Sequence, residues 1–519
     1  MKVLFLPENK QIVVEQGTTL LSAMKKAGLY MDAPCGGYGN CGKCKVLVTK
    51  GNHHEYTPEE IKTLSNEERS KGLRLACRMP IVEDTCVILP DSRANISQSS
   101  RNKATSIKGN RDKLLGLAVD VGTTTIEYAI VDMKDGSIVI KNRFYNPQRK
   151  YGADVMARIT ACMQDENKVK ELQKDLIEEL NDRLNVSLNS LGVSLNDIKK
   201  AVLVANTTMC HIVTGHNPYK LACAPFQPDY KGGDIQPANK LGLSFAEDST
   251  VEVLPIIGGH VGADTVGCLT FLELDKMEEY HLLVDIGTNG EMVLKGKDRI
   301  VACSTAAGPA FEGSSMAYGM CAGPGAIHKV TYENNEIRLL VEGNVRPVGI
   351  SGTGIIDAVA TLLRAGIMDH SGYLKEEYCV IDPVSGQAGY CLFQDDESGV
   401  YITRQDIRQL QLAKAAIAAG IKILLEVAGL TLQQLSGIWI AGAFGTNLNL
   451  DNAMLLGLLP TITKTRYHQV GNAALSGAIK RLNNQVKIEE LRDLTNSIIH
   501  VDLAVEKEFK EYFLREINF

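Results

Sequence analysis

Long apolar runs, basic runs and low-complexity tracts are all missing from the sequence, and each absence excludes a class of protein. No stretch approaches the roughly 18 consecutive apolar residues of a membrane-spanning helix, so we expect no membrane insertion. Residues 1–10 hold too short an apolar run for a secretion signal. Because the net charge is −6 and basic residues are not clustered, we expect no nucleic-acid partner.

What the sequence does have is a length sufficient for several domains and a large number of cysteines. Its 519 residues imply roughly two to four domains, and 45% hydrophobic with 22% charged residues is an ordinary globular composition. Of the 13 cysteines, nine are scattered singly outside one group of four. Scattered cysteines are typical of reduced thiols in a cytosol, so we expect a cytoplasmic protein in a reducing, anaerobic setting.

The group of four consists of Cys35, Cys41, Cys44 and Cys77. The first three lie in C-G-G-Y-G-N-C-G-K-C, and 32 residues separate Cys44 from Cys77. Three thiolates on a glycine-rich loop plus a distant fourth match the ligand layout of a [2Fe–2S] cluster. The glycines let the backbone approach closely and direct N–H groups at sulfur. The alternatives are a structural zinc site, which usually has two short cysteine pairs, and unligated cysteines.

The residues around these cysteines are similar to the ferredoxin family with the β-grasp fold. Residues 2–7 and 11–16 predict a hairpin, and residues 18–28 predict a helix that ends at Gly28. Five residues separate Cys35 from Cys41, so the spacing resembles the adrenodoxin type rather than the plant type. We therefore expect an α+β ferredoxin-like domain at residues 1–90.

The rest of the chain predicts a linker and a two-lobed α/β domain. Residues 91–113 are polar and aperiodic, which indicates a flexible linker, with a linker docked on its neighbour as the alternative. From residue 114, apolar runs alternate with amphipathic stretches. We assign residues 114–278 to a first lobe and residues 279–519 to a second lobe with the C-terminal region. Strands are expected at residues 114–120, 126–132, 201–206, 281–287, 291–295 and 437–442, and helices at about 166–192 and about 404–429. Thr403 and Asp406 predict an N-terminal cap for the second helix.

One motif occurs twice. Residues 115–132 and 281–294 each contain an apolar strand, then D-x-G-T, then a second strand. Backbone N–H and hydroxyl donors at such a turn can hold phosphate oxygens, and the aspartate can hold a divalent cation beside them. A single D-x-G-T would be ordinary turn chemistry. Two copies, each ending a buried strand, favour a nucleotide site.

Paired phosphate hairpins resemble the actin, Hsp70 and sugar-kinase superfamily (ribonuclease H-like fold), which holds a nucleotide between two lobes. Residues 348–366 and 439–448 look like its adenosine segments, and residues 202–209 resemble its first connecting segment. Each glycine loop alone would be a tight helix–strand junction. Their order along the chain favours an actin-like ATPase domain.

The whole chain resembles the ATP-dependent reductive activators of corrinoid proteins. R-L-A-C-R at Cys77, the two D-x-G-T motifs, I-I-G-G-H-V-G-A-D (256–264) and G-N-A-A-L-S-G-A (471–478) carry the resemblance. It implies an enzyme that passes one electron from a [2Fe–2S] cluster to Co(II) on a corrinoid protein, giving Co(I), at the expense of ATP and Mg²⁺. It also implies an upstream electron donor and a homodimer formed through the C-terminal domain.

The resemblance assigns roles to residues of the cleft. Asp120 and Asp285 are expected to position Mg²⁺ and water, and Glu291 to orient the attacking water. The expected nucleotide contacts are Gly122, Thr123, Thr124, Gly287, Thr288, Asn289 and Gly290 on the phosphate side and Gly352, Gly354 and Gly442 on the adenosine side. His260 and Asp264 are either an acid/base or switch pair, or a structural histidine at a glycine turn. A small-molecule kinase with a regulatory cluster and a plain electron carrier with a nucleotide-sensing domain are the competing functions.

Overall fold

In the computed structural model, the described residues are 1–6, 10–27, 29, 31, 39, 42, 44–51, 55–89, 114–152, 154–189, 191–308, 310–311, 313, 316–320, 322–383, 385–395, 399–442 and 444–519. The expected linker at 91–113 and the expected helix end at Gly28 lie outside them. Contacts divide the chain into two compact units. The first consists of Met1–Ser97, Gly313–Ser351 and Leu362–Arg408, and the second of Gln98–Glu312, Gly352–Thr361 and Gln409–Phe519.

A five-stranded sheet forms the N-terminal region, in the order β2-β1-β5-β3-β4. Its strands are β1 (Lys2–Leu6), β2 (Lys10–Val13), β3 (Lys45–Lys50), β4 (Leu73–Leu75) and β5 (Thr85–Ile88), and its helices are α1 (Leu20–Lys26), α2 (Pro58–Thr63) and α3 (Asn66–Ser70). β1 pairs antiparallel with β2 and parallel with β5. Alternate β1 residues Val3 and Phe5 enter a core shared with Leu20 and Met24 of α1. The predicted hairpin, helix and ferredoxin-like α+β fold are confirmed.

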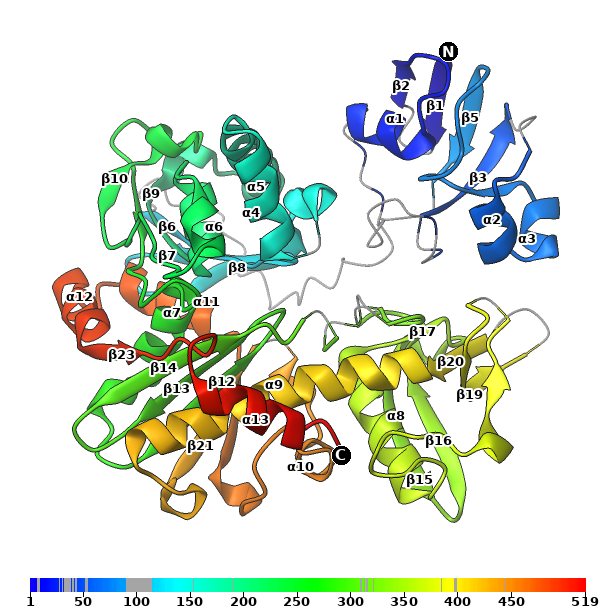
Figure 1. Ribbon diagram of the computed structural model, residues 1–519. Helices are drawn as coiled ribbons and strands as arrows, with labels where there is room; N and C mark the ends of the chain where they lie inside the picture. Colours follow the sequence, from blue (N-terminus) through cyan, green and yellow to red (C-terminus); the bar gives the residue numbers. More distant parts are fainter. Residues whose placement is uncertain are drawn as a thin grey trace. The chain divides into compact units, whose positions relative to one another are not determined.

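Two six-stranded sheets form the centre of the second unit (Figure 1), and five strands of each repeat one topology, while the sixth, β10 or β23, is added at opposite edges. The first has the order β10-β11-β9-β6-β7-β8 and the second β22-β21-β12-β13-β14-β23. The first sheet consists of β6 (Leu115–Val121), β7 (Thr125–Asp132), β8 (Ile138–Tyr145), β9 (Ile198–Ala205), β10 (Ile235–Pro237) and β11 (Thr250–Val253). The second consists of β12 (His281–Ile286), β13 (Gly290–Lys295), β14 (Ile300–Thr305), β21 (Gly437–Ala441), β22 (Tyr467–Gly471) and β23 (Ile498–His500). In each sheet three antiparallel strands are followed by two that run parallel to the first. This repeat confirms the expected two-lobed α/β fold.

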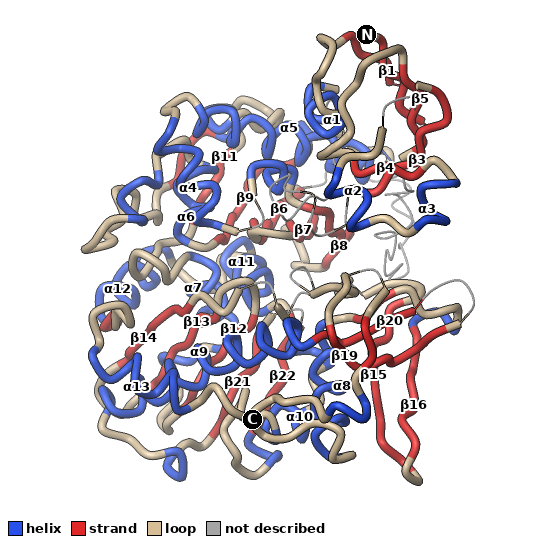
Figure 2. The backbone as a smooth tube through the Cα atoms, turned by 45° about the vertical axis from the view of Figure 1, so that its right-hand side comes forward, coloured by secondary structure: helices blue, strands red, loops and turns tan. Residues whose placement is uncertain are grey.

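Two helices, α7 (Ala263–Leu272) and α11 (Ala473–Leu482), lie side by side between these sheets (Figures 1 and 2). Glycines permit their close approach, because a Cβ added at Gly477 would lie 1.9 Å from the carbonyl oxygen of Gly267. On its other side α11 packs on the first sheet, where a Cβ at Gly116 would lie 2.8 Å from Leu482. The two lobes therefore meet through a tight helix pair.

The remaining helices are α4 (Val155–Gln164), α5 (Lys168–Asn189), α6 (Thr207–Val213), α8 (Gly352–Arg364), α9 (Arg404–Ala428), α10 (Leu450–Leu455), α12 (Ile488–Ser497) and α13 (Lys507–Arg515). α5 and α9 confirm the two predicted long helices. Thr403 and Asp406 form the predicted cap, with the Thr403 N–H donating to Asp406 Oδ2 at 2.9 Å and the Asp406 N–H to Thr403 Oγ1 at 3.1 Å. No helix among the described residues is long and apolar enough to cross a membrane.

Two small sheets belong to the first unit. One has the order β16-β15-β17 and the other β18-β19-β20. Their strands are β15 (Ala326–Glu333), β16 (Glu336–Val341), β17 (Gly349–Ile350), β18 (Val380–Ile381), β19 (Ala388–Gln394) and β20 (Gly399–Thr403). β17 leads directly into α8, so residues 348–366 form the predicted glycine turn followed by a helix.

Candidate functional site: a cysteine group and a paired hairpin site

Two of the four grouped cysteines lie in the described part of the chain, and they lie together. The sulfur atoms of Cys44 and Cys77 are buried and 3.3 Å apart. Cys35 and Cys41 lie outside the described residues. Gly39, between them in sequence, has a positive φ of 76°, which favours glycine.

The residues around Cys44 and Cys77 fit a bound iron–sulfur cluster. Two sulfurs from distant segments are brought together, and a glycine loop contacts the segment that carries Cys77. The Nε–H of Arg78 is buried and has no hydrogen-bond partner within the described residues. The Oε2 atom of Glu59, whose Oε1 accepts from Arg78 Nη2, is likewise buried without a partner. The two adjacent buried sulfurs are therefore the feature that fits a thiolate-ligated cluster.

The two D-x-G-T turns face each other. The Oγ1 atoms of Thr124 and Thr288 are 3.4 Å apart, although the two residues are 164 positions apart in the sequence. Each turn joins two antiparallel strands, β6 to β7 and β12 to β13. These hairpins form locally because each apolar strand is interrupted by Gly and Thr, and the sheets then direct both turns to one place.

Each hairpin presents two carboxylates opposite one another. Asp120 pairs across the strands with Glu127, and Asp285 pairs with Glu291. The motif analysis identified the two aspartates and Glu291 but missed Glu127. A signal was present, because a glutamate lies near the start of the second strand in both copies, at D-V-G-T-T-T-I-E and D-I-G-T-N-G-E.

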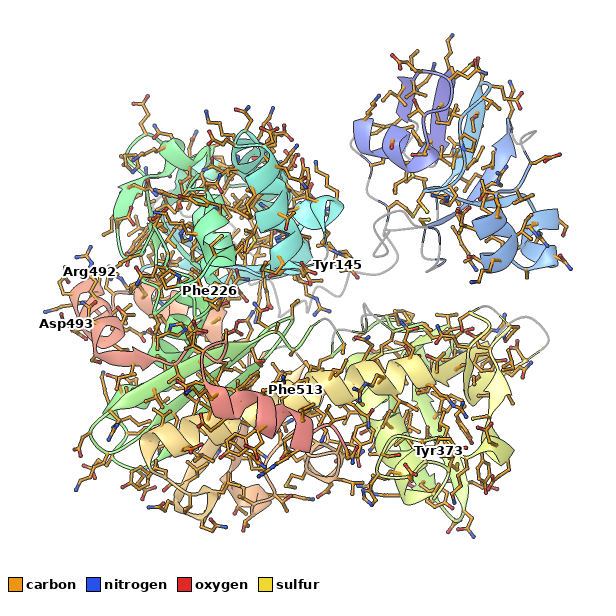
Figure 3. The ribbon with its side chains drawn as sticks, viewed as in Figure 1. Tyr145, Phe226, Tyr373, Arg492, Asp493 and Phe513 are labelled. Atoms are coloured by element: carbon orange, nitrogen blue, oxygen red, sulfur yellow. The ribbon has the colours of Figure 1, made fainter. Side chains whose placement is uncertain are left out.

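Buried polar side chains hydrogen-bond to the first D-x-G-T turn and hold it in place. Asn206 Nδ2 donates to Thr123 Oγ1 at 2.8 Å, and Asn146 Nδ2 donates to the carbonyl of Gly122 at 2.8 Å. The fully buried Arg158 donates to the carbonyl of Thr123. Tyr145, labelled in Figure 3, is the last residue of β8 and pairs in register with Thr125 of β7. The turn is therefore held rigidly, as a binding loop for phosphate requires.

Burial and mutual repulsion raise the pKa values of the carboxylates. Burial raises the pKa of Asp285 to about 6. Burial first, and then the charge of Asp285, raise the pKa of Asp264 to about 7. The pKa values of Asp120 and Glu291 are also raised, mainly by burial and further by neighbouring aspartates. A group of carboxylates this close favours a positive ion or proton at its centre.

Two further side chains, which the motifs did not predict, contact this group. Asn472 Nδ2 donates to Asp120 Oδ2 at 2.8 Å and to Glu127 Oε2 at 3.0 Å. The Cys268 thiol donates to Asp285 Oδ2 at 3.5 Å, and burial raises the pKa of this thiol. Both come from the α7–α11 pair, because Asn472 caps α11 and Cys268 lies within α7.

The glycines expected on the adenosine side are close to the hairpins at one position. Gly442 follows β21 with a φ of 88°, and a Cβ there would lie 2.8 Å from Asp285 Oδ1. Gly352 opens α8, and a Cβ there would lie 1.7 Å from the carbonyl of Phe311. Gly354 lies in the first turn of the same helix. The buried side chains of Asp357 in α8 and Asn452 in α10 are joined by a hydrogen bond of 2.5 Å.

His260 and Asp264 have different neighbours in the structure. Asp264 belongs to the carboxylate group, whereas the ring of His260 lies 5.5 Å from that of Phe226, labelled in Figure 3. Burial lowers the pKa of His260, and Asp502 partly opposes this shift. Within the described ranges, no three His, Cys, Asp or Glu side chains are arranged to hold a metal ion by themselves.

Comparison with known proteins places these features in a family. The family model for the 2Fe–2S iron–sulfur cluster binding domain matches residues 4–82, that for the RACo middle region matches 115–277, and that for the C-terminal, ASKHA domain of RACo matches 279–519.

Relatives align along most or all of the chain. The corrinoid activation enzyme RamQ of Eubacterium limosum is 28% identical over 100% of this chain and 99% of its own. The [Co(II) methylated amine-specific corrinoid protein] reductase of Methanosarcina barkeri is 26% identical over 78% of this chain and 77% of its own. The solved structure of a reductive activator for corrinoid, iron–sulfur protein has a TM-score of 0.72 and 28% identity, covering 100% of this chain and 98% of that one. The chain belongs to the family of reductive activators of corrinoid proteins, with a 2Fe–2S ferredoxin-like domain ahead of an ASKHA domain.

Proposed function

We propose that this protein is an ATP-dependent reductive activator that passes one electron to Co(II) of a corrinoid protein and so restores Co(I). The single observation that supports it best is the joint presence of facing D-x-G-T hairpins and a cysteine site in one chain. Two relatives that align with most or all of this chain are named a corrinoid activation enzyme and a Co(II) corrinoid protein reductase.

Cys35, Cys41, Cys44 and Cys77 would hold the cluster, which supplies one-electron transfer when it is bound. The chain's own residues shape this site, since the Gly39 loop and the segment at Cys77 are held together by side chains of α2. The electron that the cluster transfers would come from an upstream donor.

The hairpin site would bind ATP. Thr123, Thr124, Thr288, Asn289 and the glycines Gly122, Gly287 and Gly290 would donate to phosphates, while Gly352, Gly354 and Gly442 would leave room for the adenosine. Mg²⁺ prefers phosphate oxygens, waters and one or two carboxylates over an all-protein site. Asp120 and Asp285 would therefore hold Mg²⁺ together with the nucleotide, which agrees with the absence of a three-ligand metal site in the described part of the chain.

Reduction of Co(II) to Co(I) is uphill for an ordinary donor, so ATP must bias a conformational equilibrium. Two lobes that meet through a tight helix pair would supply such an element if nucleotide binds one arrangement of the lobes better than another. Glu291 would orient the water that attacks the γ-phosphate. We further propose a homodimer and a cytoplasmic location, which the buried, unbridged thiols of Cys162, Cys210, Cys268 and Cys303 favour.

The decisive experiment mixes the reduced, cluster-loaded protein with a Co(II) corrinoid protein and follows Co(I) absorbance with and without Mg-ATP. ATP-dependent Co(I) formation is expected. Cluster oxidation without Co(I), or equal rates without ATP, would contradict the proposal. Phosphorylation of a small molecule at the expense of ATP would favour the kinase alternative.

A further inference from the structure

Three consecutive carbonyl groups of the first D-x-G-T turn accept hydrogen bonds from the protein itself. The Gly122 carbonyl accepts from Asn146 Nδ2 at 2.8 Å, and the Thr124 carbonyl accepts from the Asn146 backbone N–H at 2.9 Å. Between them, the Thr123 carbonyl accepts from the guanidinium of Arg158, which is fully buried. The carbonyls of residues 122–124 are therefore all directed at protein donors.

The hydroxyl oxygen of Thr123 is used as an acceptor too. Asn206 Nδ2 donates to it at 2.8 Å, and both side chains are buried. A hydroxyl group has one proton to donate and lone pairs that accept. Because an amide nitrogen can only donate, the Thr123 oxygen accepts in this bond and its own proton is directed elsewhere. No described residue accepts that proton.

Helix α6 fixes the orientation of the Asn206 amide. Asn206 is the N-cap of this helix, and its Oδ1 accepts the Met209 N–H at 3.0 Å. The two ends of a side-chain amide are told apart by their partners, and a backbone N–H can be met only by the oxygen. The nitrogen of Asn206 is therefore the atom that faces Thr123.

Asn146 is oriented in the same way. It caps the short 3-10 helix Pro147–Tyr151, and its Oδ1 accepts the Gln148 N–H at 2.9 Å. Its nitrogen is therefore the end that faces Gly122. Two asparagines from separate segments thus each present a donor to one turn, and each is held in that orientation by a helix cap.

The turn consequently offers a ligand donors rather than acceptors. Its carbonyls and the Thr123 oxygen are engaged from behind, whereas the Thr123 hydroxyl proton is not. A phosphate oxygen accepts hydrogen bonds and carries negative charge, so it is the chemical class that such a turn suits. The positive charge of Arg158 behind the turn favours an anion as well.

We propose that Asn206 is a positioning residue of the nucleotide site: by donating to Thr123 Oγ1 it directs the Thr123 hydroxyl proton at a phosphate oxygen of the bound nucleotide. Asn206 acts through Thr123 and does not contact the nucleotide. A change that turns the Thr123 proton away from the site weakens binding of the nucleotide phosphates. This inference rests on the nucleotide site of the proposed function.

The first test measures the affinity of the full-length chain for Mg-ATP by calorimetry. Asn206→Asp retains a good N-cap but replaces the donor with a carboxylate oxygen, which accepts the Thr123 proton itself. We expect the dissociation constant of Mg-ATP to rise about tenfold or more, because hydrogen bonds to charged groups are among the strong ones.

Asn217→Asp is the matched control. Asn217 also caps a short helix, Pro218–Ala222, and its Nδ2 donates to a carbonyl, that of Cys162, at 3.3 Å. The change adds the same charge to the same lobe, and Mg-ATP affinity should equal that of the unmodified chain. An equal loss in Asn206→Asp and Asn217→Asp would reduce the effect to added charge and overturn the proposal.

A double-mutant cycle tests whether Asn206 acts through the Thr123 hydroxyl. Asn206→Ser retains a capping oxygen without adding charge and loses the amide donor, and Thr123→Val removes the hydroxyl. Each change alone should weaken Mg-ATP binding, and Asn206→Ser should add little once Thr123→Val is present, since both remove one interaction. Fully additive losses would show that Asn206 acts by another route and would overturn the proposal.

The unmodified chain separates the two levels of inference. If it does not bind Mg-ATP, the nucleotide site of the proposed function is wrong. If it binds Mg-ATP and both Asn206 variants bind equally well, only the role of Asn206 is overturned. If circular dichroism shows that the Asn206 variants do not fold, Thr123→Val and Thr123→Ser decide instead. Weaker binding in Thr123→Val than in Thr123→Ser, which retains the hydroxyl, is expected, and equal affinities overturn the proposal.

Discussion

Asn472 combines two tasks in one side chain. Its Nδ2 donates to Asp120 and Glu127, while its Oδ1 accepts the Leu475 N–H and caps α11. The hydrogen bond from Asn472 is the main influence that opposes the rise of the Asp120 pKa caused by burial. The residue therefore connects the charge state of the hairpin site to a helix of the lobe junction.

Asn472→Ser retains a capping oxygen and loses the amide donor. The pKa of Asp120 should then rise further, so the pH–rate profile of ATP hydrolysis should move to higher pH. Steady-state hydrolysis across pH values from about 5 to 9 measures this. Asn449→Ser, the same change at the cap of α10, is the control. If the pH–rate profile of Asn449→Ser also shifts to higher pH, the effect comes from lost helix capping rather than from Asp120.

The raised carboxylate pKa values predict how stability depends on pH. The pKa of Asp285 is raised to about 6 by burial, and the pKa of Asp264 to about 7 by burial and the charge of Asp285. The folded state thus holds protons that the unfolded chain releases at about pH 4. The stabilisation that the Asp285 and Asp264 carboxyl groups contribute is fully present below about pH 4, and it is lost as the pH rises through about 6 to 7.

We therefore expect the thermal midpoint of the nucleotide-free protein to fall over this pH window. Mg-nucleotide should offset the loss, because a cation stabilises the ionised carboxylates. Asp285→Asn should flatten the dependence, since the amide does not titrate, whereas Asp275→Asn on the surface should not. Scanning calorimetry with and without Mg-nucleotide measures the thermal midpoint at each pH. A midpoint that rises with pH would refute the assignment.

At the scale of elements, the contact between α7 and α11 is the junction of the two lobes. Gly477→Ala places a methyl group where the Gly267 carbonyl lies, at 1.9 Å, so the helices must separate. Overpacking of this kind costs about 1–3 kcal/mol of unfolding free energy. Because Asn472 and Cys268 belong to the same helix pair, ATP hydrolysis should fall as well.

Denaturant unfolding and steady-state hydrolysis measure these two effects of Gly477→Ala. Ser476→Ala, one residue earlier in α11 and partly exposed, adds no group to the contact and should change the unfolding free energy little. If both variants behave alike, the helix contact does not control the site.

At the scale of the whole molecule, the cysteine site and the hairpin site are built from separate sets of residues. Cys77→Ser should abolish the 2Fe–2S spectrum and Co(I) formation while nucleotide binding persists. Asp285→Asn should leave the spectrum intact and reduce ATP hydrolysis by about 10²-fold or more, the usual weight of a positioned catalytic carboxylate. Calorimetry measures nucleotide binding and visible absorbance measures the cluster, and both are recorded for the two variants. Loss of the cluster spectrum in Asp285→Asn would show that the two sites depend on each other for folding.

Local pattern in the amino-acid sequence was enough to predict the individual elements and motifs. Cysteine spacing predicted the ferredoxin-like domain, hydrophobic periodicity predicted β6, β7, β12, β13, α5 and α9, and the repeated D-x-G-T motif predicted two equivalent hairpins. Such signals are readable because a turn, a strand or a ligand loop is set by neighbouring residues. Asp120, Asp285 and Glu291 could be named for the same reason.

Contacts between residues far apart in the sequence could be learned from the folded structure alone. Asn472 lies 352 positions from Asp120, and no local pattern indicates that its amide donates there. The contact of Cys268 with Asp285, the facing of Thr124 and Thr288 and the placement of Arg78 over Gly39 likewise arise from packing between elements. Side-chain contacts of this kind depend on helix and sheet placement, which is a property of the folded core rather than of any segment.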